Sequence, residues 1–145
     1  MNDFVDPSAL VLDWGDAAGM SNDPDSRPLL LVVDDNPVNL LLLGELLEAD
    51  YDLRFANSGA HALTAATMVP QPSLILLDMM MPGMDGMEVL RHLMADPLTA
   101  SIPVIFVTAK VESVDEEQGL RAGAVDYVTK PISPMVLTAR IRTHL

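Results

Sequence analysis

Residue types that can do chemistry follow several apolar runs in this sequence, at the points where each run ends. Asp34 and Asp35 follow LLLVV, Asp78 follows LILL, Thr108 follows VIFV, and Lys130 follows DYVT. A group of carboxylates suits a hard divalent cation such as Mg²⁺, which takes oxygen ligands and keeps several waters. An opposing lysine and hydroxyl suit the oxygens of a phosphoryl group, with one carboxylate as the nucleophile. If the fold gathers these residues, the sequence predicts a site for metal-assisted phosphoryl transfer.

Strands and helices are expected to alternate along the chain. The predicted strands are 29–35, 51–56, 73–78, 103–109 and 124–130, and the predicted helices are about 37–49, 58–68, 85–96, 112–122 and from 133 onward. Three of the strands are continuous apolar runs buried on both faces, whereas 51–56 alternates and predicts an edge strand. Short connections favour a (βα)5 doubly wound α/β fold with a parallel five-stranded sheet. The carboxyl ends of parallel strands share one edge, where such folds bind ligands.

Charge and composition exclude several classes of function. The 145-residue chain has a net charge of −13 and no cysteine. The acidic balance argues against nucleic-acid binding, because phosphate contacts need clustered Lys and Arg. Without cysteine there is no disulfide and no thiolate metal site. No basic region precedes an apolar one near residue 1, so we expect no signal peptide, and no apolar stretch approaches the roughly 20 residues that span a bilayer. We therefore expect a cytoplasmic protein without a membrane partner.

Residues 1–27 differ in composition from the rest of the chain. They hold six acids and one base, a net charge of −5, and residues 28–145 carry the remaining −8. We therefore predict an acidic N-terminal extension, 1–27, and one domain, 28–145. The extension is either a solvated flexible segment or one whose Leu10, Leu12 and Trp14 dock on the domain or on a neighbour.

Four segments resemble the signatures of the receiver domain of two-component response regulators. They are VVDDN, LILLDMMMPGMDG, VIFVTA and DYVTKP, and they occur in the family's order within residues 28–145. The resemblance implies the flavodoxin-like fold with strand order 2-1-3-4-5. It also implies a signalling domain that receives a phosphoryl group from a histidine kinase or a phosphotransfer protein. Such a domain is not a classical enzyme, although it catalyses its own Mg²⁺-dependent aspartyl phosphorylation and dephosphorylation.

The resemblance assigns roles to the acids. Asp78 is the expected phosphoacceptor. Mg²⁺ is expected to bind Asp35 directly and Asp34 mostly through water, with Asp78 and the backbone carbonyl of Met80 as further ligands. Met80 also stands, with Lys110, at a position that tunes dephosphorylation in the family.

The resemblance also implies a switch. Thr108 and Lys130 are expected to hold phosphoryl oxygens, and Tyr127 is expected to move as Thr108 shifts toward the phosphate. The change would reach the surface of the fourth helix, fifth strand and fifth helix, which often forms a homodimer in the family. The Lys130–Pro131 bond matches one that is usually cis. The ending of the chain is similar to receivers joined to cyclic-di-nucleotide enzymes or hybrid kinases, so we expect an effector domain beyond residue 145.

Simpler interpretations stand beside these roles. Tyr127 can be ordinary strand packing. A phosphorylation-independent scaffold would keep the fold alone. A haloacid-dehalogenase-like phosphatase also uses a strand-end aspartate, but it needs a second aspartate at the position of Met80. The five methionines between 79 and 87 could bind a soft metal, although core and loop packing is the favoured interpretation because no cysteine joins them.

The helix predicted at 37–49 carries more leucine than one buried stripe needs. The leucines are 40, 41, 42, 43, 46 and 47. We expect that some of this apolar surface stays exposed and meets a kinase or phosphotransfer partner, or that it is buried as additional core.

Overall fold

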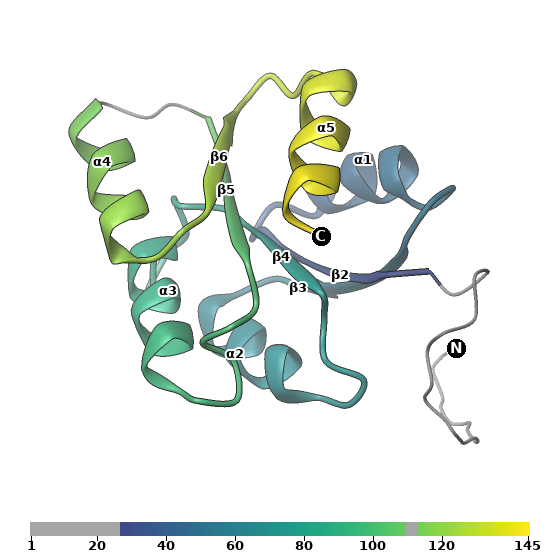
Figure 1. The fold of residues 1–145 in the computed structure, drawn as a ribbon. Coiled ribbons are helices and arrows are strands. Elements are labelled where there is room, and N and C mark those ends of the chain that lie inside the picture. Colours follow the sequence, from purple (N-terminus) through teal and green to yellow (C-terminus); the bar gives the residue numbers. More distant parts are fainter. Residues whose placement is uncertain (1–26, 110–112) are drawn as a thin grey trace.

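The computed structural model describes residues 27–109 and 113–145. The predictions for Leu10, Leu12, Trp14 and Lys110 lie outside the described residues. Within them, strands and helices alternate as expected (Figure 1). The strands are β2 (Leu29–Val33), β3 (Asp52–Ala56), β4 (Leu74–Leu77), β5 (Val104–Thr108) and β6 (Asp126–Thr129). The helices are α1 (Pro37–Leu47), α2 (Gly59–Thr67), α3 (Gly86–Ala95), α4 (Ser113–Ala122) and α5 (Pro134–His144).

The strands form one parallel sheet in the order β3-β2-β4-β5-β6. Counted along the described chain, this is the predicted order 2-1-3-4-5. The apolar strands β2, β4 and β5 are central, and the alternating strand β3 lies at an edge, as predicted. All strands point the same way, so the carboxyl ends of the three central strands meet at one edge of the sheet.

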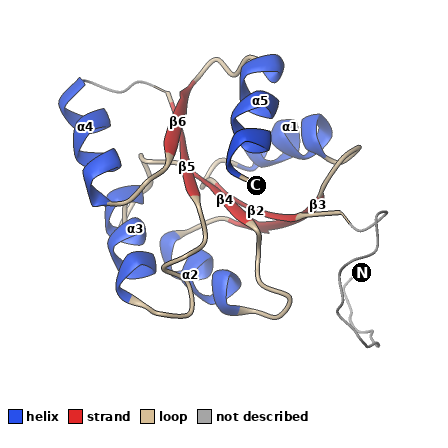
Figure 2. Ribbon diagram, viewed as in Figure 1, coloured by secondary structure: helices blue, strands red, loops and turns tan. Residues whose placement is uncertain are grey.

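Helices cover both faces of the sheet (Figure 2). α1 and α5 pack on one face, where Leu43 and Leu137 join Leu30 in a buried core. α2, α3 and α4 cover the other face, where Leu90 packs with Leu31 in a second core. Burial on both faces explains why the central strands are continuous apolar runs.

Helix boundaries follow local hydrogen bonding. The side chains of Asn36, Ser58, Asp85 and Ser133 all accept bonds from backbone N–H groups in the first turn of the helix that follows, as N-cap residues do. α4 ends before Gly123, whose positive φ of 124° closes the helix. None of the described helices is long and apolar enough to cross a bilayer.

Candidate functional site

Three carboxylates lie together where β2 and β4 end. Asp34, Asp35 and Asp78 each contribute one oxygen to a group whose members all lie within 4.8 Å of one another. Asp34 and Asp78 are buried, and Asp35 is exposed. The fold therefore brings Asp78 next to the adjacent pair Asp34 and Asp35, at the edge where the sequence predicted a site. We call this group, together with Lys130 and Thr108, the acidic edge.

The same local turn ends both acidic strands. Oδ1 of Asp34 accepts a 2.9 Å hydrogen bond from the N–H of Asn36, and Oδ1 of Asp78 accepts a 3.2 Å bond from the N–H of Met80. A carboxylate that bonds the backbone two residues onward turns the chain and fixes its own direction. β2 and β4 consequently end one or two residues earlier than the sequence predicted, and both acids belong to the turns.

Lys130 reaches the carboxylates from the end of β6. Its Nζ lies 3.0 Å from Oδ2 of Asp34 and 4.0 Å from Oδ2 of Asp78, so its closer partner is Asp34. The backbone N–H of Lys130 donates to the carbonyl of Thr108 at 2.7 Å, which ties this loop to β5. The Lys130–Pro131 peptide bond is cis, as expected.

Burial and like charge act together on Asp78. The pKa of its carboxyl group is raised to about 6, chiefly because burial removes solvent and also because the charge of Asp34 lies close by. The Met80 N–H and the Lys130 ammonium oppose this by favouring the ionised form. The ionised form of Asp78 is therefore energetically unfavourable unless additional positive charge lies nearby, and a divalent cation would supply that charge.

Thr108 ends β5 beside these groups with an unused hydroxyl. Its side chain is fully buried, and among the described residues its Oγ1 is the buried side-chain polar atom with no hydrogen-bond partner. Buried polar atoms are normally paired, because an unpaired hydroxyl costs about 1–3 kcal/mol. An oxygen of a bound group would give Oγ1 the acceptor that no described residue supplies.

The family model for the response regulator receiver domain matches residues 30–142. The chain belongs to this family. The receiver domain is 42% identical over 126 residues to a probable cyclic di-GMP phosphodiesterase of Vibrio cholerae. The aligned region covers 87% of this chain and 28% of the relative. It is also 42% identical over 120 residues to the DNA-binding response regulator MtrA of Mycolicibacterium smegmatis. That aligned region covers 82% of this chain and 51% of the relative.

The two relatives differ in the output that their names state, and the chain spans only 28% and 51% of their lengths. The match therefore concerns the receiver part, which functions in two-component signalling. The fold is flavodoxin-like. Chemotaxis protein CheY4 of Vibrio cholerae superposes with a TM-score of 0.77 at 24% identity, covering 83% of this chain and all of CheY4.

Asn39 contributes to the receiver site although sequence reasoning missed it. Its Nδ2 donates to Oδ2 of Asp34 at 3.1 Å, the same oxygen that faces Lys130. No motif marks Asn39. Its place three residues after the Asn36 cap, on the first turn of the helix above Asp34, is the signal that could have found it.

The remaining predicted residues lie where packing dominates. Met79 and Met81 are buried, which agrees with packing as the favoured interpretation of the methionines. The Met80 side chain is 69% exposed, and a methionine at this position disfavours the phosphatase alternative. Tyr127 is half-buried and packs against the core on the α2–α4 face, so its place fits packing and leaves its switch role a prediction.

Proposed function

We propose that this receiver domain accepts a phosphoryl group on Asp78 from a phosphohistidine of a histidine kinase or phosphotransfer protein, and that it catalyses this transfer to itself. The observation that carries the proposal is the combination at the acidic edge. A buried carboxylate with a raised pKa lies beside a second buried carboxylate and a lysine, and the neighbouring strand β5 ends in a buried hydroxyl without a partner. A structural ion pair has no need of the additional carboxylates or of the unpaired hydroxyl.

The donor set fits Mg²⁺. All three clustered side chains offer carboxylate oxygens, which are hard ligands, and the exposure of Asp35 leaves room for waters. Asp34, Asp35 and Asp78, with the backbone carbonyl of Met80, would hold the ion. When bound, it would supply positive charge for the oxygens of the phosphoryl group.

The chain's own groups supply the remaining chemistry. A carboxylate oxygen of Asp78 forms the new bond to phosphorus as the phosphorus–nitrogen bond of the donor breaks. The Lys130 ammonium shares the negative charge of the phosphoryl oxygens. The Thr108 hydroxyl donates to one of these oxygens and gains the partner that it lacks. Asn39, together with the Asn36 N–H, holds Asp34 in place beside Lys130.

The acyl phosphate adds charge and acceptor oxygens where β4 and β5 end. In this proposal Thr108 and Tyr127 transmit that change to the surface of α4, β6 and α5, where a homodimer or a linked effector responds. Two relatives are named as a probable phosphodiesterase and a DNA-binding regulator, and the chain spans only part of each, which supports an effector joined to the same polypeptide.

Labelling of the whole chain tests the proposal. Acetyl phosphate with Mg²⁺ should phosphorylate the wild type, and beryllofluoride should bind it, whereas Asp78→Asn should do neither. Asp52→Asn, which removes an exposed acid on β3, should be labelled like the wild type. Equal labelling of Asp78→Asn would show that another residue is the acceptor, and a melting curve excludes loss of folding as the cause.

A further inference from the structure

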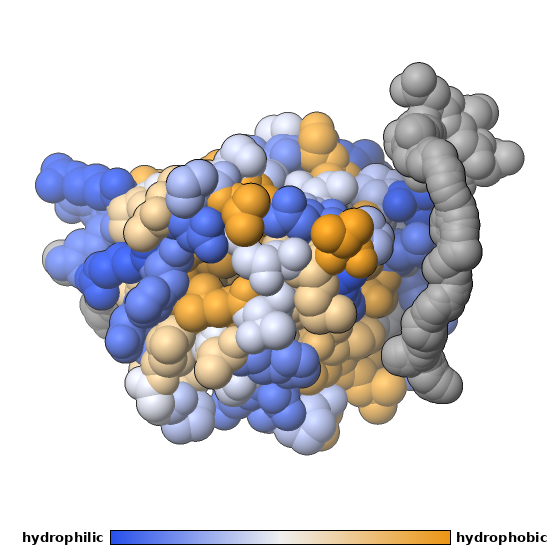
Figure 3. Space-filling model, turned by 90° about the horizontal axis from the view of Figure 1, so that it is seen from below, coloured by the Kyte–Doolittle hydropathy of each residue, from blue (hydrophilic) through white to orange (hydrophobic). Residues whose placement is uncertain are grey.

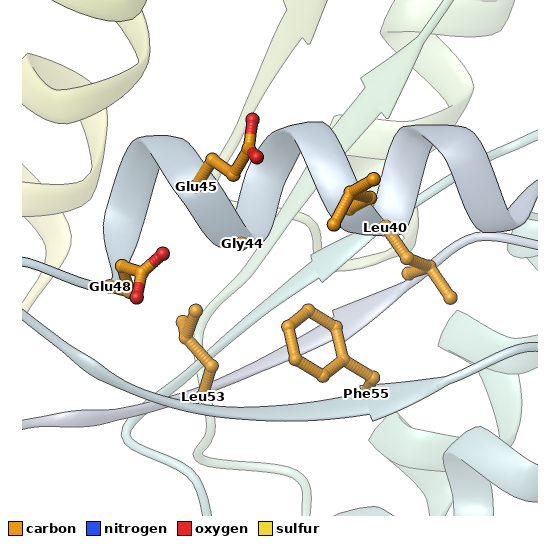
Figure 4. Close-up of a pocket in the computed structure, with 7 residues that line it drawn as sticks. Leu40, Gly44, Glu45, Glu48, Leu53 and Phe55 are labelled. Carbon is orange, nitrogen blue, oxygen red and sulfur yellow. The ribbon is translucent and has the colours of Figure 1, made fainter.

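An apolar groove lies between α1 and the edge strand β3 (Figure 4). Its volume is about 440 Å³, and we call it the α1–β3 groove. Leu53 and Phe55 project from β3 toward α1, whose Leu40 and Leu41 form the facing wall, and Glu45 and Glu48 supply the charge. The groove lies apart from the acidic edge, and the proposed phosphoryl transfer does not use it.

The groove exists because fewer helices pack on this face of the sheet than on the other. Among the residues that the structure describes, two helices (α1 and α5) cover this face and three cover the other. Gly44 adds no side chain above Phe55, where a Cβ would lie 3.2 Å from the ring. Phe55 is 40% exposed and Leu41 is 63% exposed as a result. Adjoining exposed apolar side chains of this kind mark a surface that another segment covers.

Arg27, the first residue that the structure describes, contacts the domain beside this groove. The guanidinium of Arg27 donates to the carbonyl of Ala49 and lies 4.0 Å from the carboxylate of Asp52. Ala49 lies in the connection from α1 to β3 and Asp52 begins β3, so both are next to groove residues, Glu48 and Leu53 respectively. The 26 residues that precede Arg27 therefore join the domain at one end of the groove.

We propose that residues 9–14, ALVLDW, occupy the α1–β3 groove. Ala9 to Leu12 form an apolar run without an acid, and Trp14 is the one tryptophan of the chain. Twelve residues separate Trp14 from Arg27 and reach up to about 40 Å when extended, more than the roughly 16 Å length of α1. Attachment gives the segment a high effective concentration at the groove, so its intrinsic affinity can be weak.

Charge gives the possible occupants of the groove different responses to salt. Asp6 precedes the segment and Asp13 lies within it. Both acids repel Glu45 and Glu48, but exposed charges are screened beyond about 8 Å at physiological salt. A second copy of the chain meets the same repulsion, with a net charge of −13, and lacks the tether. Added salt should therefore strengthen the docking of the segment, whereas it would weaken the docking of a basic partner.

Fluorescence of Trp14 in the full chain tests the proposal. The wild type should show blue-shifted emission that acrylamide quenches poorly, with the protection rising with salt. Leu41→Glu, inside the groove, should shift emission to the red and remove the protection. Leu42→Glu is the matched control, because Leu42 is similarly exposed and lines a different groove between α1 and α5. Asp78→Asn should leave the signal unchanged, because the docking does not depend on phosphoryl transfer.

Disulfide trapping provides the second measurement, since the chain has no cysteine of its own. Leu12→Cys with Leu41→Cys should form an intramolecular disulfide, and Leu12→Cys with Leu42→Cys should form much less. Two results would overturn the proposal. One is equal quenching of Trp14 in Leu41→Glu and Leu42→Glu. The other is protection that depends on protein concentration, which would assign the groove to a second copy.

Discussion

At the acidic edge, Asp34 and Lys130 come within 3.0 Å although they are 96 positions apart, whereas the α1–β3 groove is formed entirely within residues 40–55. The acidic edge is largely buried and holds four charged groups and an orphaned hydroxyl. The groove is open and mostly apolar. Figure 3, which views another side of the molecule, shows that scattered apolar residues also reach its surface among polar ones.

The difference teaches where single substitutions should matter. Charges held close together at a buried edge interact strongly, because little water screens them. A change of one group there alters the energies of all the others. In an apolar groove the stabilisation is roughly proportional to the apolar area that is buried, so one substitution changes the free energy by a small amount. The predictions below run from the largest expected effect, at the acidic edge, to the smallest, in the groove.

Removing the Lys130 ammonium should have the largest effect. Lys130→Ala should slow phosphorylation by acetyl phosphate about 100-fold, because one fixed charge aimed at the reacting oxygens is worth about 2.7 kcal/mol. Arg121→Ala removes a cation that pairs with Glu117 on the exposed surface of α4, and its rate should equal that of the wild type. Unchanged phosphorylation of Lys130→Ala would mean that Lys130 serves only to hold Asp34.

Adding one methyl group beside Asp78 should be nearly as costly. A Cβ on Gly86 would lie 2.5 Å from the carbonyl oxygen of Asp78 and 2.6 Å from Cα of Met79. These are backbone atoms, so the turn that carries Asp78 must move. Gly86→Ala should lower the free energy of unfolding by about 2 kcal/mol, measured by urea denaturation. Wild-type stability in this variant would show that the backbone of the turn can shift at little energetic cost.

Most of the fold could be predicted from sequence, for a physical reason. Strands buried on both faces must be apolar throughout, and helices need capping side chains, so β2, β4, β5 and the four N-caps are visible in residue types. The convergence at the acidic edge follows from parallel strand direction. The family resemblance supplied the strand order and the roles of individual residues.

Other features depend on distances that no local pattern encodes. Asn39 looks like an ordinary helix residue until Asp34 is placed beneath it. The orphaned hydroxyl of Thr108 is a property of its surroundings. The surplus leucines predicted exposed apolar surface, which Leu41 and Leu42 confirm, but not that they line different grooves.

Neutralising Asp78 should stabilise the metal-free protein. Its pKa rises from 3.8 to about 6 on folding, so ionisation of this group opposes folding. The stability that Asp78 contributes is complete below pH 3.8 and is lost as the pH rises through about 6. In EDTA, Asp78→Asn should therefore be about 2 kcal/mol more stable than the wild type at pH 8 and nearly equal to it at pH 4. A constant difference across this range would contradict the raised pKa.

Mg²⁺ should reduce this advantage by stabilising the wild type more than the variant. A concentration ten times Kd adds about 1.4 kcal/mol to the free energy of unfolding. Thermal melts at pH 8, with and without Mg²⁺, measure this directly. Equal stabilisation of both proteins would place the metal away from Asp78.

Replacing the Thr108 hydroxyl by a methyl group should separate stability from function. Thr108→Val removes an unpaired buried hydroxyl and should raise the free energy of unfolding by about 1 kcal/mol, while weakening beryllofluoride binding. Thr99→Val is the matched control, because the buried Thr99 hydroxyl donates to the Leu93 carbonyl at 2.7 Å. The control should lose about 1 kcal/mol. Destabilisation of both variants would show that Thr108 already has a partner.

The smallest effect should come from the same methyl addition made in the groove. A Cβ on Gly44 would lie 3.2 Å from Cζ of Phe55, the far end of a partly exposed side chain that can move. Alanine is favoured over glycine inside a helix by about 1 kcal/mol, so Gly44→Ala should gain about 0.5 kcal/mol after this contact is relieved. The opposite signs at Gly44 and Gly86 then separate side-chain from backbone contact. If Gly44→Ala is destabilised instead, Phe55 is held rigidly, and the groove already has its final shape before any segment enters it.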